Sequence, residues 1–277
     1  MAFMINDKSK TGFARHCPAF AKAYPAFAKA CDRMVETIRK GFETRKIGKM
    51  ISDLNDADRS CRMRAAGALW KAAEDGNDVS SAISALTEAL ADENATVREN
   101  AALALAKAAE KGINVRSAIP ELTKALADLD ADVRGNSALA LGNAAEKGTD
   151  ITAAISPLTN LLSDPNENVR LYAAFALGNA AEKGTDIAQS VTALANLLSD
   201  PNADVRKYAS EAFCNVALKG DHEARVSVVS QIMQFLHSGL FKAEAERNSV
   251  AFVQMTTQCA RLMQEIEKAE KKQRETI

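Results

Sequence analysis

A step of 36 residues, repeated along most of the 277-residue chain, constrains the fold more than any other feature of this sequence. The dipeptide Val-Arg recurs at this step, and one step before its first copy lies Cys61-Arg62. The arginines are Arg62, Arg98, Arg134, Arg170 and Arg206. A glycine recurs at the same step, at Gly76, Gly112, Gly148, Gly184 and Gly220. Matched positions at one constant step predict a stack of similar units, each burying its apolar face against its neighbours.

Each unit is predicted to form two helices. Apolar residues at i, i+3 and i+7 mark the first helix, because this spacing puts them on one buried stripe. They are Ile47, Met50, Leu54, Ile83, Leu86, Leu90, Ile119, Leu122, Leu126, Ile155, Leu158, Leu162, Val191, Leu194 and Leu198. The second helix is rich in alanine, which lets successive copies approach closely. Gly142 and Gly178 replace Ala106 in later units, so close packing must outweigh the ~1 kcal/mol that glycine costs in a helix.

Short polar residues at fixed places in each unit predict the helix ends. One set precedes the second helix, where a side-chain oxygen can accept hydrogen bonds from unpaired backbone amides. This set is Asp58, Asn94, Asp130, Asn166 and Asn202. A second set precedes the next first helix and consists of Asp78, Asn114, Asp150 and Asp186. The recurring glycine suits the left-handed residue that ends the second helix. The sequence is therefore expected to be all-α.

Across roughly residues 43–222 this pattern resembles HEAT and armadillo repeats, and its clearest copy is LLSDPNENVRLYAAFALGNAAEKG (Leu161–Gly184). The resemblance implies a right-handed α-solenoid of two-helix repeats, and it leaves HEAT and armadillo both open. It also implies that an aspartate in each turn bonds the arginine of Val-Arg and ties adjacent repeats, as in the HEAT Asp–Arg ladder. The aspartates are Asp56, Asp92, Asp128, Asp164 and Asp200.

The ends of the chain depart from the repeat, so three parts are expected: a basic helical cap over 1–42, five repeats over 43–222, and a helical cap over 223–277. In the first part a seven-residue duplication forms one stripe, which Pro25 is expected to kink. That stripe is Phe20, Tyr24, Phe27 and Cys31. In the last part a long helix over about 242–274 carries Phe252, Met255, Cys259, Leu262 and Ile266. This second stripe either caps the last repeat or mediates self-association through a coiled-coil seam.

Charge and cysteine content exclude several classes of protein. The 35 basic and 36 acidic residues divide into a net +5 over 1–42 and −6 over the rest, which disfavours nucleic acid as the partner. Five scattered cysteines and three lone histidines form no zinc spacing or disulfide framework, so we expect no metal or cofactor and a reducing, cytoplasmic location. No apolar run is long enough for a membrane span. Contact of the basic residues in 1–42 with an anionic membrane or an acidic partner is the alternative to a plain cap.

The solvent-facing side of the second helices is the predicted binding surface. In solenoids these helices line the concave side, so positions 36 residues apart form rows along it. Aromatic and apolar residues on such a surface often mark an interaction site. Asparagine offers both a donor and an acceptor to a peptide backbone, and the resemblance to the armadillo asparagine implies the same role. The candidate residues are Asn143, Asn179, Asn215, Leu139, Phe175, Tyr172, Tyr208 and Lys107.

We therefore expect a non-catalytic scaffold or adaptor that binds an extended segment of another protein along the concave second-helix surface. One alternative is that these side chains only pack on neighbouring helices. Others are a HEAT-like enzyme, of the DNA alkylation glycosylase or bilin-lyase type, and a structural subunit of a larger assembly. A glycosylase needs a basic track, whereas Glu74, Glu110, Glu146 and Glu182 form an acidic row. No arrangement of catalytic side chains stands out, so no catalytic residue is assigned.

Overall fold

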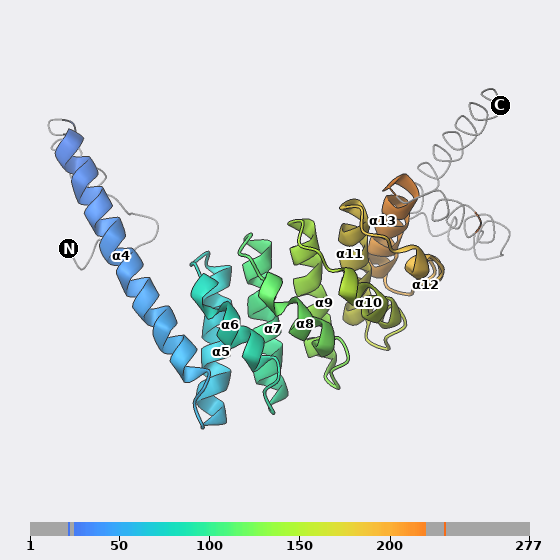
Figure 1. The fold of residues 1–277 in the computed structure, drawn as a ribbon, viewed down its shortest axis with the longest axis horizontal. Helices are drawn as coiled ribbons and strands as arrows, with labels where there is room; N and C mark the ends of the chain where they lie inside the picture. Colours follow the sequence, from blue (N-terminus) through green and yellow to red (C-terminus); the bar gives the residue numbers. More distant parts are fainter. Residues whose placement is uncertain (1–21, 23–24, 220–229, 231–277) are drawn as a thin grey trace.

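The computed structural model describes residues 22, 25–219 and 230, and this part of the chain contains only helices and turns. A long helix, α4 (Pro25–Asp53), leads into a row of similar second helices (Figure 1). These are α5 (Arg59–Glu74), α7 (Ala95–Glu110), α9 (Ala131–Glu146), α11 (Glu167–Glu182) and α13 (Ala203–Lys219). The solenoid predicted from the repeat is therefore the observed fold.

The first helix of each later unit is shorter than the second and begins with a single 3-10 turn. The short helices are α6 (Ile83–Ala89), α8 (Ile119–Ala125), α10 (Ile155–Leu161) and α12 (Val191–Leu197). The 3-10 turns before them are Ser80–Ala82, Arg116–Ala118, Thr152–Ala154 and Ala188–Ser190. Each short helix lays its apolar stripe on the second helix of its unit, where Leu86, Leu122, Leu158 and Leu194 are fully buried.

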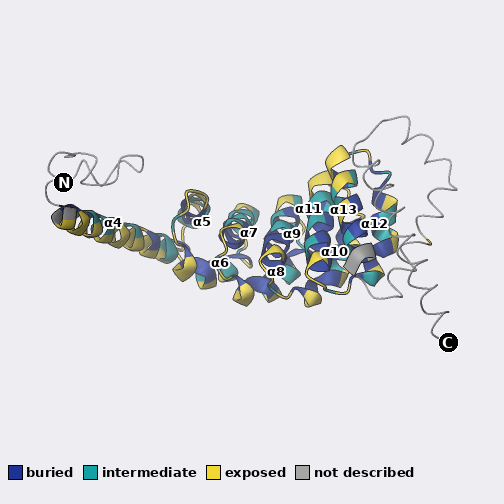
Figure 2. Cartoon of the chain, turned by 90° about the horizontal axis from the view of Figure 1, so that it is seen from above, coloured by how far each residue is buried: buried dark blue, intermediate teal, exposed yellow. Residues whose placement is uncertain are grey.

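Two rows of helices make up the stack. Figure 2 shows the second helices in one row and the short helices in the other, with the second helices on the inner side of the curve. Each second helix packs along the next one, whereas the short helices contact mainly the second helix of their own unit. The inner row is close-packed because its contact faces consist largely of alanine, such as Ala101, Ala104 and Ala108, all with 0% exposure.

Both predicted sets of caps form. Before the second helices, Asn166 accepts hydrogen bonds from the amides of Asn168 and Val169, at 2.9 and 3.3 Å. Asp130 and Asn202 likewise accept from two amides, whereas Asp58 accepts from Ser60 and Asn94 from Val97. Before the short helices, Asp150 accepts from the amide of Thr152 at 2.9 Å, as its three counterparts do in their turns. The glycines that end α5, α7, α9 and α11 have φ between 78° and 85°, the left-handed conformation expected of them.

The predicted Asp–Arg ladder also forms. Arg98 donates from Nε and Nη2 to both carboxylate oxygens of Asp128 in the next unit, at 2.7 and 2.8 Å. Nη1 of Arg98 donates to the backbone carbonyl oxygen of Asp92, in the turn before the same helix, at 2.9 Å. The same bidentate ion pair recurs as Arg62–Asp92, Arg134–Asp164 and Arg170–Asp200. Each arginine therefore fixes the turn that precedes it and the unit that follows it.

The boundary expected between a cap and the first repeat falls inside a helix. Helix α4 runs without a break through residues 42 and 43, and its C-terminal part supplies the buried Ile47 of the first repeat. Pro25 is the first residue of α4 that the structure describes. The expected kink at Pro25 and the expected long helix over 242–274 both depend on residues outside the described part of the chain, as do the side chains of the aromatic stripe. No helix within the described ranges is long and apolar enough to span a membrane.

Candidate functional site

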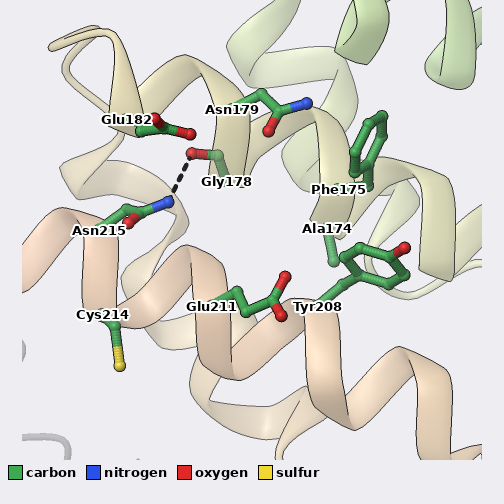
Figure 3. A pocket seen from close by; sticks show the side chains of 9 residues that line it. All are labelled: Ala174, Phe175, Gly178, Asn179, Glu182, Tyr208, Glu211, Cys214 and Asn215. Carbon is green, nitrogen blue, oxygen red and sulfur yellow. Dashed lines mark hydrogen bonds between the residues drawn. The ribbon is translucent and has the colours of Figure 1, made fainter. Parts of the chain in front are cut away.

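A cavity of about 300 Å³ opens between α11 and α13 at the last two described second helices. Figure 3 shows the nine side chains that line it, all of which come from these two helices. Four of them belong to the predicted binding surface: Phe175, Asn179, Tyr208 and Asn215. The inner row thus brings half of the candidate residues into one place.

An aromatic pair forms one wall of this cavity. The rings of Phe175 and Tyr208 lie 5.5 Å apart between centroids and meet edge to face at 79°, an arrangement favoured by the quadrupoles of the two rings. The ammonium group of Lys207 lies 5.2 Å from the centre of the Tyr208 ring. This aromatic wall is rigid and apolar, which suits the aliphatic part of a ligand.

The cavity lies where the matched residue changes from phenylalanine in one unit to glutamate in the next. Between α9 and α11, the Phe175 ring fills the space over Gly142: a Cβ on this glycine would lie 2.6 Å from the ring. One unit later the residue at the position of Phe175 is Glu211, and the atoms nearest to a Cβ on Gly178 would belong to Ala212, the first at 3.3 Å. Glu211 leaves open the space that phenylalanine fills in the previous unit, and places a carboxylate beside it.

The three candidate asparagines have a role that the sequence did not reveal. Asn143, Asn179 and Asn215 each donate from Nδ2 to a backbone carbonyl of the preceding second helix, 37 residues earlier. The acceptors are Ala106, Gly142 and Gly178, at 2.9, 3.1 and 3.1 Å. One amide hydrogen of each asparagine therefore ties two repeats together, and at 5% exposure Asn143 has little surface left for a partner.

The remaining candidates lie outside the cavity. Leu139 and Tyr172 are half-buried and pack against the apolar core, and Tyr172 covers Gly135 of the preceding helix. Lys107 is half-buried and donates to Glu110 on its own helix at 2.8 Å, a hydrogen bond that lowers the pKa of Glu110. None of these three residues lines the cavity.

Sequence reasoning missed the acidic character of the site. Glu182 and Glu211 line the cavity, together with the buried Cys214. The sequence does contain a sign of this acidic character. At one position of the repeat, the residues 36 apart are Leu103, Leu139, Phe175 and Glu211, and only the last is acidic. Within the part of the chain that the structure describes, no three histidine, cysteine or acidic side chains gather as metal ligands would.

Comparison with known proteins agrees with this architecture. A family model described as non-SMC mitotic condensation complex subunit 1 matches residues 72–156 and 150–277, more than half of the chain. No curated protein matches.

Solved structures of repeat proteins are similar in fold. One is a designed armadillo repeat protein, 23% identical, covering 77% of this chain and 98% of its own, with a TM-score of 0.64. Another designed armadillo repeat protein, in complex with the peptide (KR)4, has the same identity and coverage and a TM-score of 0.66. An engineered protein is 22% identical over 79% of this chain and 97% of its own, with a TM-score of 0.62. At these identities the likeness concerns the fold.

Proposed function

We propose, since the chain belongs to the family described as non-SMC mitotic condensation complex subunit 1, that it is a non-catalytic scaffold. In this proposal an extended segment of another protein lies along the inner row of second helices and is held between α11 and α13. The observation that carries the proposal is the cavity in which Phe175, Asn179, Tyr208 and Asn215 meet. A solvent-accessible aromatic pair beside polar groups is the usual composition of a binding hot spot.

Two further observations support a scaffold over the enzymatic alternative. The acidic row is exposed along the inner helices, at Glu74, Glu110, Glu146 and Glu182, and would repel a nucleic-acid backbone. One designed armadillo repeat protein of similar fold is described in complex with a peptide, so a fold of this kind is compatible with peptide binding.

The test is capture of partner proteins by the full chain carrying Phe175→Ala and Asn179→Ala. Partners that co-purify with the unchanged chain are identified by mass spectrometry and quantified again with the double variant. We expect their recovery to fall at least about tenfold, because hot-spot truncations typically cost 2 kcal/mol or more.

The matched control is Leu129→Ala with Asn160→Ala, which removes an apolar side chain and an amide from exposed positions outside the cavity. Circular dichroism must show that both double variants stay folded, since Phe175 also packs on Gly142. Tyr208→Ala provides a second variant of the same wall. Equal recovery of partners by all of these chains would refute the proposal.

A structural subunit of a larger assembly is the second candidate, favoured by the family description as a complex subunit. It predicts a different outcome of the same experiment. A partner subunit that covers a broad surface would still be captured by the Phe175→Ala and Asn179→Ala chain, and crosslinks to it would spread over several repeats.

A further inference from the structure

We propose that the cavity between α11 and α13 accepts an arginine side chain of the bound segment. This inference rests on the proposed function and names what its central site recognises. It starts from the change from an apolar residue at Leu103, Leu139 and Phe175 to Glu211 in the last described unit. A ring fills the matching space one unit earlier, whereas the Glu211 carboxylate makes this space charged.

The charge of the lining selects a cation. Glu211 on α13 and Glu182 on α11 both line the cavity, and none of its nine lining residues is lysine, arginine or histidine. The Lys207 ammonium group lies near the Tyr208 ring but is not part of the lining, so carboxylates outnumber cations there. Figure 3 shows the Glu211 carboxylate between the Tyr208 ring and the Asn215 side of the cavity. A negatively charged recess with low-dielectric walls concentrates cations and repels acidic segments.

The hydrogen-bonding groups favour a ligand that is rich in donors. Asn179 and Asn215 each spend one amide hydrogen on the preceding helix, which fixes their orientation and leaves Oδ1 as an acceptor and one N–H as a donor. The Glu211 carboxylate adds two oxygens that only accept, so acceptors outnumber donors among these three side chains. A guanidinium group carries five N–H donors and no acceptor, so it matches this lining better than any other side chain.

Shape also favours arginine over lysine. A volume of about 300 Å³ lies at the lower end of pockets that take small molecules, and one long side chain suits it. The Phe175 and Tyr208 rings provide flat apolar surfaces for the methylene stem and the guanidinium plane. Lysine would bring a compact, strongly hydrated ammonium group that gains less from flat walls.

Short labelled peptides test the inference. The probe is a seven-residue peptide of glycine and serine with one central arginine, and its binding to the full chain is followed by fluorescence anisotropy. Its counterpart carries citrulline, which keeps the shape of arginine and removes the charge. We expect the arginine peptide to bind about tenfold more tightly than the citrulline peptide, with the lysine peptide in between, because hydrogen bonds between charged groups are the stronger ones.

Three variants locate the effect. Glu211→Phe should fill the cavity as Phe175 does over Gly142, and Glu211→Gln should keep the cavity and remove the charge. Both should abolish most of the preference for arginine over citrulline. Glu146→Gln is the matched control, because Glu146 holds the position of Glu182 one unit earlier and lies outside the cavity. A thermal melt establishes that each variant folds.

Each outcome decides the question. Equal binding of the arginine and citrulline peptides would overturn the inference, as would an equal loss with Glu146→Gln and Glu211→Gln, which would indicate attraction by general negative charge. Absence of binding by either peptide would overturn it too. Partner capture that still depends on Phe175 and Asn179 would then preserve the scaffold proposal without the arginine.

Discussion

At the scale of single residues, glycine and asparagine act together to bring neighbouring helices into contact. Gly142 has no Cβ, so the Phe175 ring of the next unit can lie directly over its backbone. The adjacent Asn143 donates to the Ala106 carbonyl of the unit before, and Asn179 does the same to Gly142. The pair Gly142-Asn143 therefore helps to set the helix spacing in the inner row. The glycine contacts the next second helix, and the asparagine hydrogen-bonds the preceding one.

Substitution of Gly142 is the sharpest test of this close contact. A Cβ there would lie 2.6 Å from the Phe175 ring and 3.1 Å from the Cα of Ala176. We expect Gly142→Ala to lower the free energy of unfolding by about 1–3 kcal/mol, the usual cost of overpacking. Gly67→Ala is the control, since a Cβ at Gly67 meets only Asn100, at 3.8 Å. It should stabilise by about 0.5–1 kcal/mol, as replacement of a glycine inside a helix does. Urea denaturation of both variants measures whether each substitution lowers or raises the free energy of unfolding.

The Asp–Arg ladder should make the fold sensitive to acid. Burial raises the pKa of Asp128, but the hydrogen bonds and charge of Arg98, with the Asp130 amide and Arg134, outweigh it and hold this pKa below its ordinary value of 3.8. A depressed pKa contributes stability that is present above the unfolded value and lost as pH falls through the folded one. The unfolding free energy should therefore decline below about pH 4.

Replacement of the aspartate isolates this contribution. Asp128→Asn should unfold more readily at neutral pH, because Arg98 loses its counter-charge, and its stability should depend less on pH between 2 and 5. Asp132→Asn, at an exposed position in the same unit, is the comparison. Parallel pH profiles of the two variants and the unchanged chain would contradict the role assigned to the ladder.

At the scale of elements, each unit begins and ends by the same local chemistry. Side-chain caps define the start of every described second helix, and left-handed glycines follow α5, α7, α9 and α11. The short outer helices have only seven residues each, too few to be stable alone, and they depend on the second helices for their burial. The caps therefore set where each element begins, and packing on its neighbours supplies most of its stability.

Loss of one cap should have a limited cost. Asn166→Ala removes the acceptor of the Asn168 and Val169 amides, and we expect the free energy of unfolding to fall by about 1 kcal/mol. Asn166→Asp should retain most of the stability, because a carboxylate accepts the same hydrogen bonds at the positive end of the helix. Asn168→Ala, two residues further and exposed, should change it by less than about 0.5 kcal/mol. Chemical denaturation followed by circular dichroism compares the three.

At the scale of the whole molecule, the main contacts among the described helices lie within a unit or between one unit and the next, so the array is a linear assembly of similar parts. Every joint uses the same ladder pair, the same glycine turn and the same apolar stripe. The length of the array is consequently less critical to its folding than the register of its units.

Deletion of one whole unit should therefore preserve the fold. Removal of residues 77–112 joins Gly76 to Ile113 and presents Asp128 to Arg62 in place of Asp92. We expect a cooperative thermal transition at a lower temperature, with helicity per residue unchanged. Removal of residues 95–112 alone deletes α7 and leaves α6 without its partner, and this chain should lose cooperative unfolding. A shortened chain of 36 fewer residues that melts without a transition would contradict the linear description.

Sequence alone predicted the features that depend on local or strictly periodic chemistry. Caps, glycine turns and buried stripes follow from residues within a few positions of each other, and the ladder follows from a pair that repeats at a constant offset. The hydrogen-bond acceptor of the Asn143 side chain could not be derived in the same way. It depends on how closely Gly142 and its counterparts let two helices approach. The cavity likewise depends on what Glu211 fails to fill, which becomes apparent only when successive inner helices are compared in space.

The ladder joins the units at one end of the second helices only, since Arg98 and its counterparts lie in the first helical turn. Because these ion pairs join the N-terminal ends of the second helices, we expect the spacing between helices to vary less at that end than at the glycine turns. The elastic response of this molecule is therefore directional. Force that spreads the glycine-turn edge meets apolar packing and the single amide hydrogen bonds of Asn143, Asn179 and Asn215, whereas force on the ladder edge must separate bidentate ion pairs.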